Sequence, residues 1–236
     1  MHQESLVAVA ERFAELERLE RLKDFTITHG DRTWKVHRTA LVVHSAVLTK
    51  ACAGNFEEAK KATIDLSADP ETAVAALVEY LYAFDYTTNV QDGGPISFHV
   101  SMFILADKYD IQPLKSLATD KFEHAMRPHR SWGNGVKKRL KTGDTIPVER
   151  RKDVVEDQNP QPEDVAYAIK LAYEARAVTK ERCIDLVEWV AGSEDVLIGD
   201  SGSDAIEGAI ESIPGFAVDI ARALRFKSND AYLPVV

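Results

Sequence analysis

Histidine, cysteine and serine are the residues here that could support nucleophilic, acid–base or metal chemistry. The seven histidines are His2, His29, His37, His44, His99, His124 and His129. None stands with Cys, Asp or Glu at a zinc-ligand spacing, and no CxxC pair is present. Ser45 and Cys52 lie close to His44 in sequence, but neither a nucleophile elbow nor an oxyanion-forming glycine pattern accompanies them. We therefore predict no catalytic residue, no metal site and no cofactor, and we interpret His37 and His44 as structural.

Cysteine usage and charge indicate the class of protein. Cys52 and Cys183 both lie in apolar helical contexts, which favours buried thiols in a reducing compartment. The net charge of -9 argues against a protein whose main task is binding nucleic-acid phosphates. We see no signal peptide and no apolar run near the ~18 residues that a membrane span needs. We expect a soluble cytoplasmic and/or nuclear protein without membrane or direct nucleic-acid contacts.

One basic cluster stands apart from this acidic background, with Lys137, Lys138, Arg139 and Lys141 inside five residues. It belongs to residues 127–162, a stretch poor in apolar clusters and rich in Pro, Gly and Asn. That stretch carries nine basic and five acidic residues, so its charge of +4 leaves -13 on the rest of a chain whose total is -9. We predict a basic flexible linker or insertion. The cluster is a candidate nuclear import signal, and a short basic run without a role is the alternative.

Two strand regions are predicted from alternating apolar residues. In the first, Phe25 and Ile27 alternate with threonines, and Gly30-Asp31 supplies a turn before the chain returns over residues 33–36. The second is the short run at residues 63–66. We expect these runs to form a small sheet.

Apolar residues at steps of three and four predict helices in most of the remaining chain. Ser45 is a plausible N-cap for one of two short helical segments that follow the hairpin. The predicted organisation is an N-terminal helix (1–22), a mixed domain (23–126), the basic linker or insertion (127–162), a C-terminal helical extension (163–226) and a tail (227–236).

An ordered set of motifs runs through the mixed domain. Its members are Asp24, Trp34-Lys35-Val36-His37-Arg38, Leu41, Ile64-Asp65-Leu66, Tyr80-Leu81-Tyr82 and Ala106-Asp107-Lys108-Tyr109. In this order they resemble the BTB (also called POZ) domain family, over roughly 100 of the 236 residues. Residues 36–66 and the segment Ile213–Leu224 further resemble the BTB proteins of filamentous fungi and their C-terminal extensions.

The resemblance implies an α+β fold, the BTB/POZ fold, in which helices flank a small mixed sheet, here followed by an all-helical extension. The family binds proteins, forms homodimers and supplies many adaptors of cullin-based ubiquitin ligases, and enzyme activity is not a family trait. We therefore expect a non-enzymatic protein–protein interaction module that self-associates and recruits partners. The alternative is a nuclear scaffold or transcriptional co-regulator that uses the same oligomerisation.

Family homodimers form through the N-terminal helix and the sheet edge. The apolar stripe of that helix would pack either on its own domain or on a second copy. Asp24 and Arg38 occupy the family positions for a charged pair near the dimer interface, and a salt bridge within one chain is the alternative. The predicted dimer-interface residues are Leu6, Val9, Phe13, Leu16, Leu19, Asp24 and Arg38.

The family contacts a cullin scaffold through an apolar-x-Glu triplet after the second short helix. Phe56, Glu57 and Glu58 fit that triplet and are expected on a loop, where Phe56 would anchor in a partner pocket. The alternative is that Phe56 folds back onto its own core. Many members carry Met-Phe shortly before the triplet, whereas this chain departs from that pattern with Ala51-Cys52.

Overall fold

The structure is a computed structural model, and it describes residues 2–88, 93–127, 160–192 and 203–230. Within these ranges, the side chains of residues 2–7, 203 and 226–230 are not described. The predicted import cluster at Lys137, Lys138, Arg139 and Lys141 lies outside the described residues, as do most of the basic stretch and the end of the tail.

The described residues form two compact units. The first unit holds the chain up to Thr88 together with Leu105–Leu117. The second unit holds the described residues of 93–104 and 118–127 and those from 160 onward. The predicted boundaries at residues 23, 127 and 163 stay predictions.

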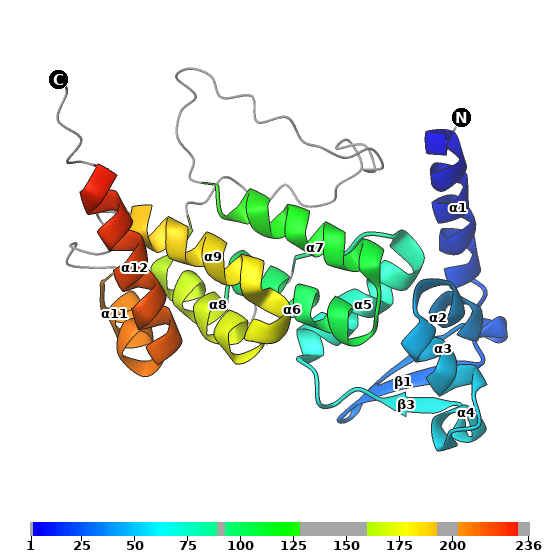
Figure 1. The fold of residues 1–236 in the computed structure, drawn as a ribbon. Coiled ribbons are helices and arrows are strands. Elements are labelled where there is room, and N and C mark those ends of the chain that lie inside the picture. Colours follow the sequence, from blue (N-terminus) through cyan, green and yellow to red (C-terminus); the bar gives the residue numbers. More distant parts are fainter. Residues whose placement is uncertain (1, 89–92, 128–159, 193–202, 231–236) are drawn as a thin grey trace. The chain divides into compact units, whose positions relative to one another are not determined.

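A three-stranded mixed sheet lies in the first unit (Figure 1). Its strands are β1 (Phe25–His29), β2 (Arg32–Val36) and β3 (Thr63–Asp65). The central strand, β1, pairs antiparallel with β2 and parallel with β3. Gly30 makes the hairpin turn with a φ of 53°, a left-handed conformation that glycine adopts without steric cost. The alternation predicted for β1 is confirmed, since Phe25 and Ile27 are buried.

Helices flank this sheet in the first unit. They are α1 (His2–Glu17), the 3₁₀ turn η1 (Glu20–Leu22), α2 (Arg38–His44), α3 (Ala46–Ala53), α4 (Glu57–Lys61) and α5 (Glu71–Ala83). Ser45 is confirmed as the N-cap of α3, because its Oγ accepts a hydrogen bond of 2.9 Å from the Leu48 N–H. The same hydroxyl donates to the Tyr109 carbonyl at 2.5 Å, which fixes α3 against the end of α6 (Pro95–Lys108).

The prediction that Phe56-Glu57-Glu58 lies on a loop is wrong, because Glu57 and Glu58 form the first turn of α4. Acidic residues in the first turn and Lys60 and Lys61 in the last both complement the helix dipole. The helix ends where Ala62 adopts a left-handed conformation, with a φ of 51°.

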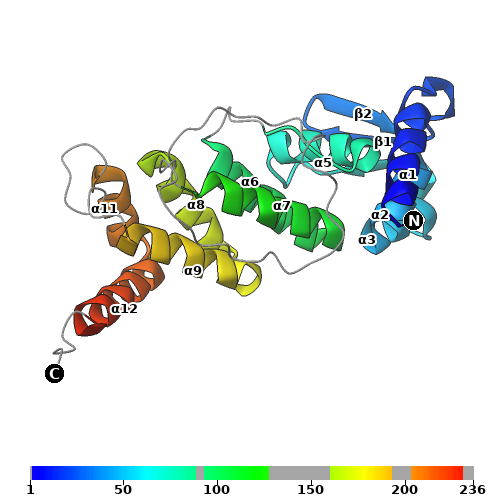
Figure 2. The same ribbon diagram turned by 90° about the horizontal axis from the view of Figure 1, so that it is seen from above.

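The second unit is entirely helical in its described part (Figure 2). It contains α8 (Pro162–Glu174), α9 (Arg176–Gly192), α11 (Ser203–Ser212) and α12 (Pro214–Asp230), together with the N-terminal part of α6 and the C-terminal part of α7 (Gln112–Ala125). Its core includes Ile96, Val100, Phe122, Val165, Ile169, Leu186, Val190, Ile206 and Phe216. Cys183 is buried here, and Cys52 is buried in the first unit, as predicted for both thiols.

Asp164 joins α8 to the start of α6 inside this unit. Its carboxylate is 5% exposed and accepts hydrogen bonds from the backbone N–H groups of Ile96, at 2.8 Å, and Ser97, at 2.9 Å. These N–H groups belong to the first turn of α6 and have no acceptor within the helix itself. A Cβ at Gly94 would overlap the carboxylate, so glycine permits the close approach.

This arrangement is the predicted α+β class, with a small mixed sheet, flanking helices and further helices beyond the mixed domain. Within the described residues, no helix combines the length and the apolar character that a membrane crossing requires.

Candidate protein-interaction surfaces

Both histidines of the central stretch make structural contacts. Tyr82 Oη lies 2.9 Å from the backbone N–H of His37, which donates to it, and 3.0 Å from His37 Nδ1. His37 Nε2 lies 3.3 Å from the Leu19 carbonyl. Because a carbonyl only accepts, Nε2 must carry the proton, and Nδ1 then accepts from the Tyr82 hydroxyl. The ring thereby ties the end of the N-terminal segment to α5.

His44 lies in an aromatic cluster between α1, α2 and α5. Its ring centroid is 5.8 Å from that of Phe13, 5.2 Å from that of Tyr80 and 4.7 Å from that of Phe84. Its Nε2 lies 3.0 Å from the Leu81 carbonyl. Burial lowers the pKa of His44, and the hydrogen bond to Leu81 raises it by less.

Burial raises the pKa of the Cys52 and Cys183 thiols, so the nucleophilic thiolate is disfavoured at both positions. Across the residues that the structure covers, no three His, Cys, Asp or Glu side chains form a group able to hold a metal ion.

The predicted dimer-interface residues of the N-terminal segment differ in how deeply they are buried. Phe13 turns inward, with its ring 5.2 Å from that of Phe84, and Leu16 is half-buried. Val9 and Leu19 are 40% and 42% exposed, while the side chain of Leu6 lies outside the description. In Figure 1 the N-terminal turns of α1 rise beyond α2 and α3. Val9 and Phe13 are one turn apart on the same side of α1, which packs on its own unit at Phe13 and is open to solvent at Val9. Leu19 follows the end of α1 and is a second exposed apolar residue.

Asp24 and Arg38 come together within one chain. The Arg38 backbone N–H donates to Asp24 Oδ1 at 2.9 Å, and Arg38 Nε lies 3.6 Å from Asp24 Oδ2. The guanidinium also donates to the carbonyls of Cys52 and Ala59, the latter at 3.3 Å, and lies over the Phe25 ring. This ion pair thus lies within one chain, and Arg38 joins β1, α3 and α4. Its place at a dimer interface stays a prediction.

Phe56 does not fold back onto the core. It is 58% exposed, the largest exposed fraction among the described large hydrophobic residues. It lies at the N-cap of α4, so the helix holds its backbone while the ring faces solvent. Phe56 is therefore a protruding aromatic residue, the other of the two arrangements that the sequence left open.

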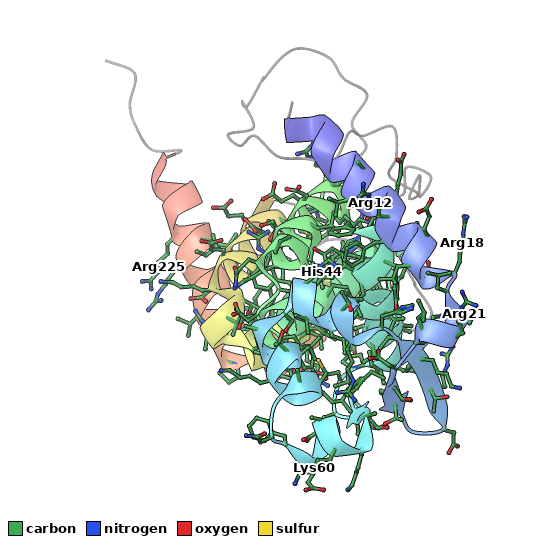
Figure 3. The ribbon with its side chains drawn as sticks, turned by 90° about the vertical axis from the view of Figure 1, so that its right-hand side faces the viewer. Arg12, Arg18, Arg21, His44, Lys60 and Arg225 are labelled. Carbon is green, nitrogen blue, oxygen red and sulfur yellow. The ribbon has the colours of Figure 1, made fainter. Side chains whose placement is uncertain are left out.

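The two glutamates that follow Phe56 differ in their contacts. Glu57 pairs with Lys60 at 2.9 Å and lies 4.0 Å from the Lys61 ammonium on the same helix. Glu58 is half-buried, and its carboxylate makes no ion pair with any described residue. Figure 3 shows α4, with Lys60 labelled, next to α3. The carboxylate at the third position of the triplet remains available to a partner.

Three exposed valines extend the apolar surface of α2 and α3 and were not predicted as surface residues. Val42, Val43 and Val47 are all exposed, whereas Leu41 is buried. A signal was present in the sequence, because successive residues of a helix point about 100° apart and Leu41-Val42-Val43 cannot all face one core.

Residues 13–125 match a family model described as the BTB/POZ domain. Among curated proteins, none matches this sequence. The matched range contains the mixed sheet, the helices α2 to α7 and the surface residues discussed above, except Leu6 and Val9, which precede it. Domains of this family mediate protein–protein interactions and are not generally catalytic. The chain therefore carries a BTB/POZ domain, a protein–protein interaction module, at residues 13–125.

Proposed function

We propose that this protein is a homodimeric, non-enzymatic adaptor that presents Phe56 and Glu58 to the cullin scaffold of a ubiquitin ligase. The observation that carries this proposal is the 58% exposure of Phe56 at the N-cap of α4. An aromatic side chain on a rigid backbone loses little conformational entropy when it enters a partner pocket. The unpaired Glu58 carboxylate lies two residues away, where it can accept hydrogen bonds from the same partner.

The homodimer rests on α1. Phe13 fixes this helix to its own unit, while Val9, one turn earlier, and Leu19, just after the helix, remain exposed apolar residues. A second copy related by a twofold axis would cover the same residues on both chains. In this proposal, Arg38 supports the interface by fixing the backbone next to it, since its guanidinium already bonds within its own chain.

The cullin contact is tested by measuring the affinity of the purified chain for a cullin N-terminal domain. Phe56→Ala should raise Kd about 30-fold, because a buried aromatic anchor contributes about 2 kcal/mol or more to binding. Glu58→Ala should weaken binding in the same direction. The matched control is Glu57→Ala, whose carboxylate already pairs within α4 and should leave Kd within about twofold. Equal effects of all three changes, or no binding by the unmutated chain, would contradict the adaptor proposal.

The dimer is tested separately by light scattering. The unmutated chain should give twice its monomer mass of 26.2 kDa. Val9→Lys introduces a charge at an exposed apolar residue of α1 and should shift the protein toward monomer. Glu15→Lys adds a lysine on another side of the same helix and serves as the control. A monomeric unmutated chain would refute the dimer and leave the cullin test unaffected.

A further inference from the structure

A groove between α7 and α9 in the second unit has an apolar floor and an acidic rim. Phe122, Met126 and Trp189 line the floor, and Glu123, Asp185 and Glu188 line the rim. The groove is shallow and open to solvent, with a volume of ≈ 420 Å³. Small-molecule sites bury most of their ligand, whereas an open groove of this kind suits the side chains of a peptide.

The charges around the groove favour a cationic occupant. Arg127 is the one basic residue among the described side chains that line it, against three carboxylates. Burial raises the pKa of Asp185, and although Arg182 lowers it, the neighbouring carboxylates of Glu123 and Glu188 raise it further. A positive side chain that enters the groove would relieve this repulsion, and the aliphatic and aromatic floor would contact its methylene groups.

A buried arginine beneath the rim provides a second, independent indication of a ligand. Arg182 is 5% exposed, and its guanidinium carbon lies 5.2 Å from the centroid of the Phe122 ring. It faces the groove carboxylates, with Nη2 3.2 Å from Asp185 Oδ2 and Nη1 3.9 Å from Glu123 Oε1. Its Nε and Nη1 are buried and form no hydrogen bond with any described residue, and Asp185 Oδ2, although ion-paired with Nη2, forms no hydrogen bond of good geometry.

Buried polar groups in folded proteins almost always form hydrogen bonds. A ligand here should therefore offer an acceptor to the Arg182 guanidinium and a donor to the Asp185 carboxylate. A peptide with basic side chains supplies both kinds of group. Its backbone carbonyls accept hydrogen bonds, and its ammonium and guanidinium groups donate them. A phosphate or a nucleic acid would bring further negative charge to a rim that is already negative.

We propose that the groove is the docking site of the chain's own basic segment, Lys137–Lys141. This segment carries four cationic residues around Leu140, so its side chains match both the rim and the floor. Arg127, which lines the groove, precedes Lys137 by ten residues, and ten residues span at most about 35 Å. A ligand attached at such a distance has a local concentration in the millimolar range, which favours it over a free partner.

Zero-length carbodiimide cross-linking of the full chain tests this proposal directly, because the reagent joins lysines to carboxylates in contact. We expect isopeptide bonds from Lys137, Lys138 or Lys141 to the carboxylates of Glu123, Asp185 or Glu188, located by mass spectrometry. A mixture of light and isotopically heavy chains separates bonds within one chain from bonds between copies. At 1 M salt the yield should fall at least fivefold, because charge attraction is screened within about 3 Å.

A variant and a matched control make the result specific. Glu188→Lys, at an exposed position of α9, should lower the yield at the two remaining groove carboxylates at least fivefold. Glu174→Lys, at an exposed position of α8, adds the same charge elsewhere in the unit and should leave it unchanged. The proposal is overturned if the lysines react equally with exposed control carboxylates such as Glu163 and Glu207. It is also overturned if the bonds form only between copies, which would identify a second chain as the occupant.

Discussion

Removal of the Asp164 carboxylate should destabilise the second unit by about 3 kcal/mol. This side chain accepts two hydrogen bonds from the first turn of α6, and both N–H groups would lose their acceptor in Asp164→Ala. A hydrogen bond to a charged group contributes about 1.5 kcal/mol or more, and two such bonds give the total. The value lies above the usual cost of about 1 kcal/mol for an exposed N-cap because this carboxylate is buried.

Asp164→Asn separates the hydrogen bonds from the charge. Asparagine keeps one acceptor oxygen, so it should retain one of the two bonds, but it loses the favourable interaction of the carboxylate with the dipole of α6. We expect a loss of about 2 kcal/mol. The matched control is Glu163→Ala, which removes an exposed carboxylate from the same turn of α8 and should cost less than about 0.5 kcal/mol.

Hydrogen exchange followed by mass spectrometry is the appropriate assay, because the two units need not unfold together. Peptides from α6 and α8 should lose protection in Asp164→Ala, while peptides from β1 should retain theirs. Two results would refute this reasoning. One is an equal effect of Asp164→Ala and Glu163→Ala. The other is a loss of protection that spares the first turn of α6.

Further predictions concern the first unit. Arg38→Lys should lower the free energy of unfolding of this unit in urea by about 2 kcal/mol at every protein concentration. The reason is that an ammonium cannot replace the contacts of the guanidinium to Asp24 and two carbonyls. An effect confined to low protein concentration would instead indicate a role in dimerisation. Because burial lowers the pKa of His44 in the folded chain, the unfolded chain binds the proton more readily below about pH 6.5. The Tm should therefore fall as pH decreases from 7 to 5, and His44→Gln should flatten this dependence, whereas an unchanged slope would exclude His44 as its source. Gly30→Ala should cost about 1 kcal/mol in urea unfolding because φ is positive there, and Gly30→Asn should cost less, so equal costs would argue against backbone strain as the cause.

Local signals in the sequence predicted those parts of the fold that depend on neighbouring residues. The alternation in β1, the glycine turn and the Ser45 cap each depend on a few adjacent residues, and each is present. Helix α4 was missed because it has only five residues and buries none of them, so it leaves no apolar periodicity. The parallel pairing of β1 with β3 joins segments about 37 residues apart, and no local pattern encodes it.

For the candidate surfaces, too, sequence motifs predicted local features but not the contacts that depend on packing. The triplet at Phe56 was found by its motif, but whether the ring faced solvent or the core depended on packing that the motif does not contain. The Arg38 contacts to the carbonyls of Cys52 and Ala59 could not be foreseen, since every residue has a carbonyl and only the fold selects among them. The carboxylate of Asp164 is a similar case, because its partners lie 67 and 68 residues away in the sequence.

The composition of the second unit's core has a consequence for protein synthesis. Ile96, Val100 and Phe122 belong to the matched domain, but most of the other buried residues of their core cluster come from α8, α9, α11 and α12. Ile206 follows Ile96 by 110 residues, which a ribosome adds in roughly 5–20 seconds. During that interval the nascent chain exposes the apolar sides of α6 and α7, and we expect chaperones to bind it there. A gene shortened to the matched residues would make that exposure permanent.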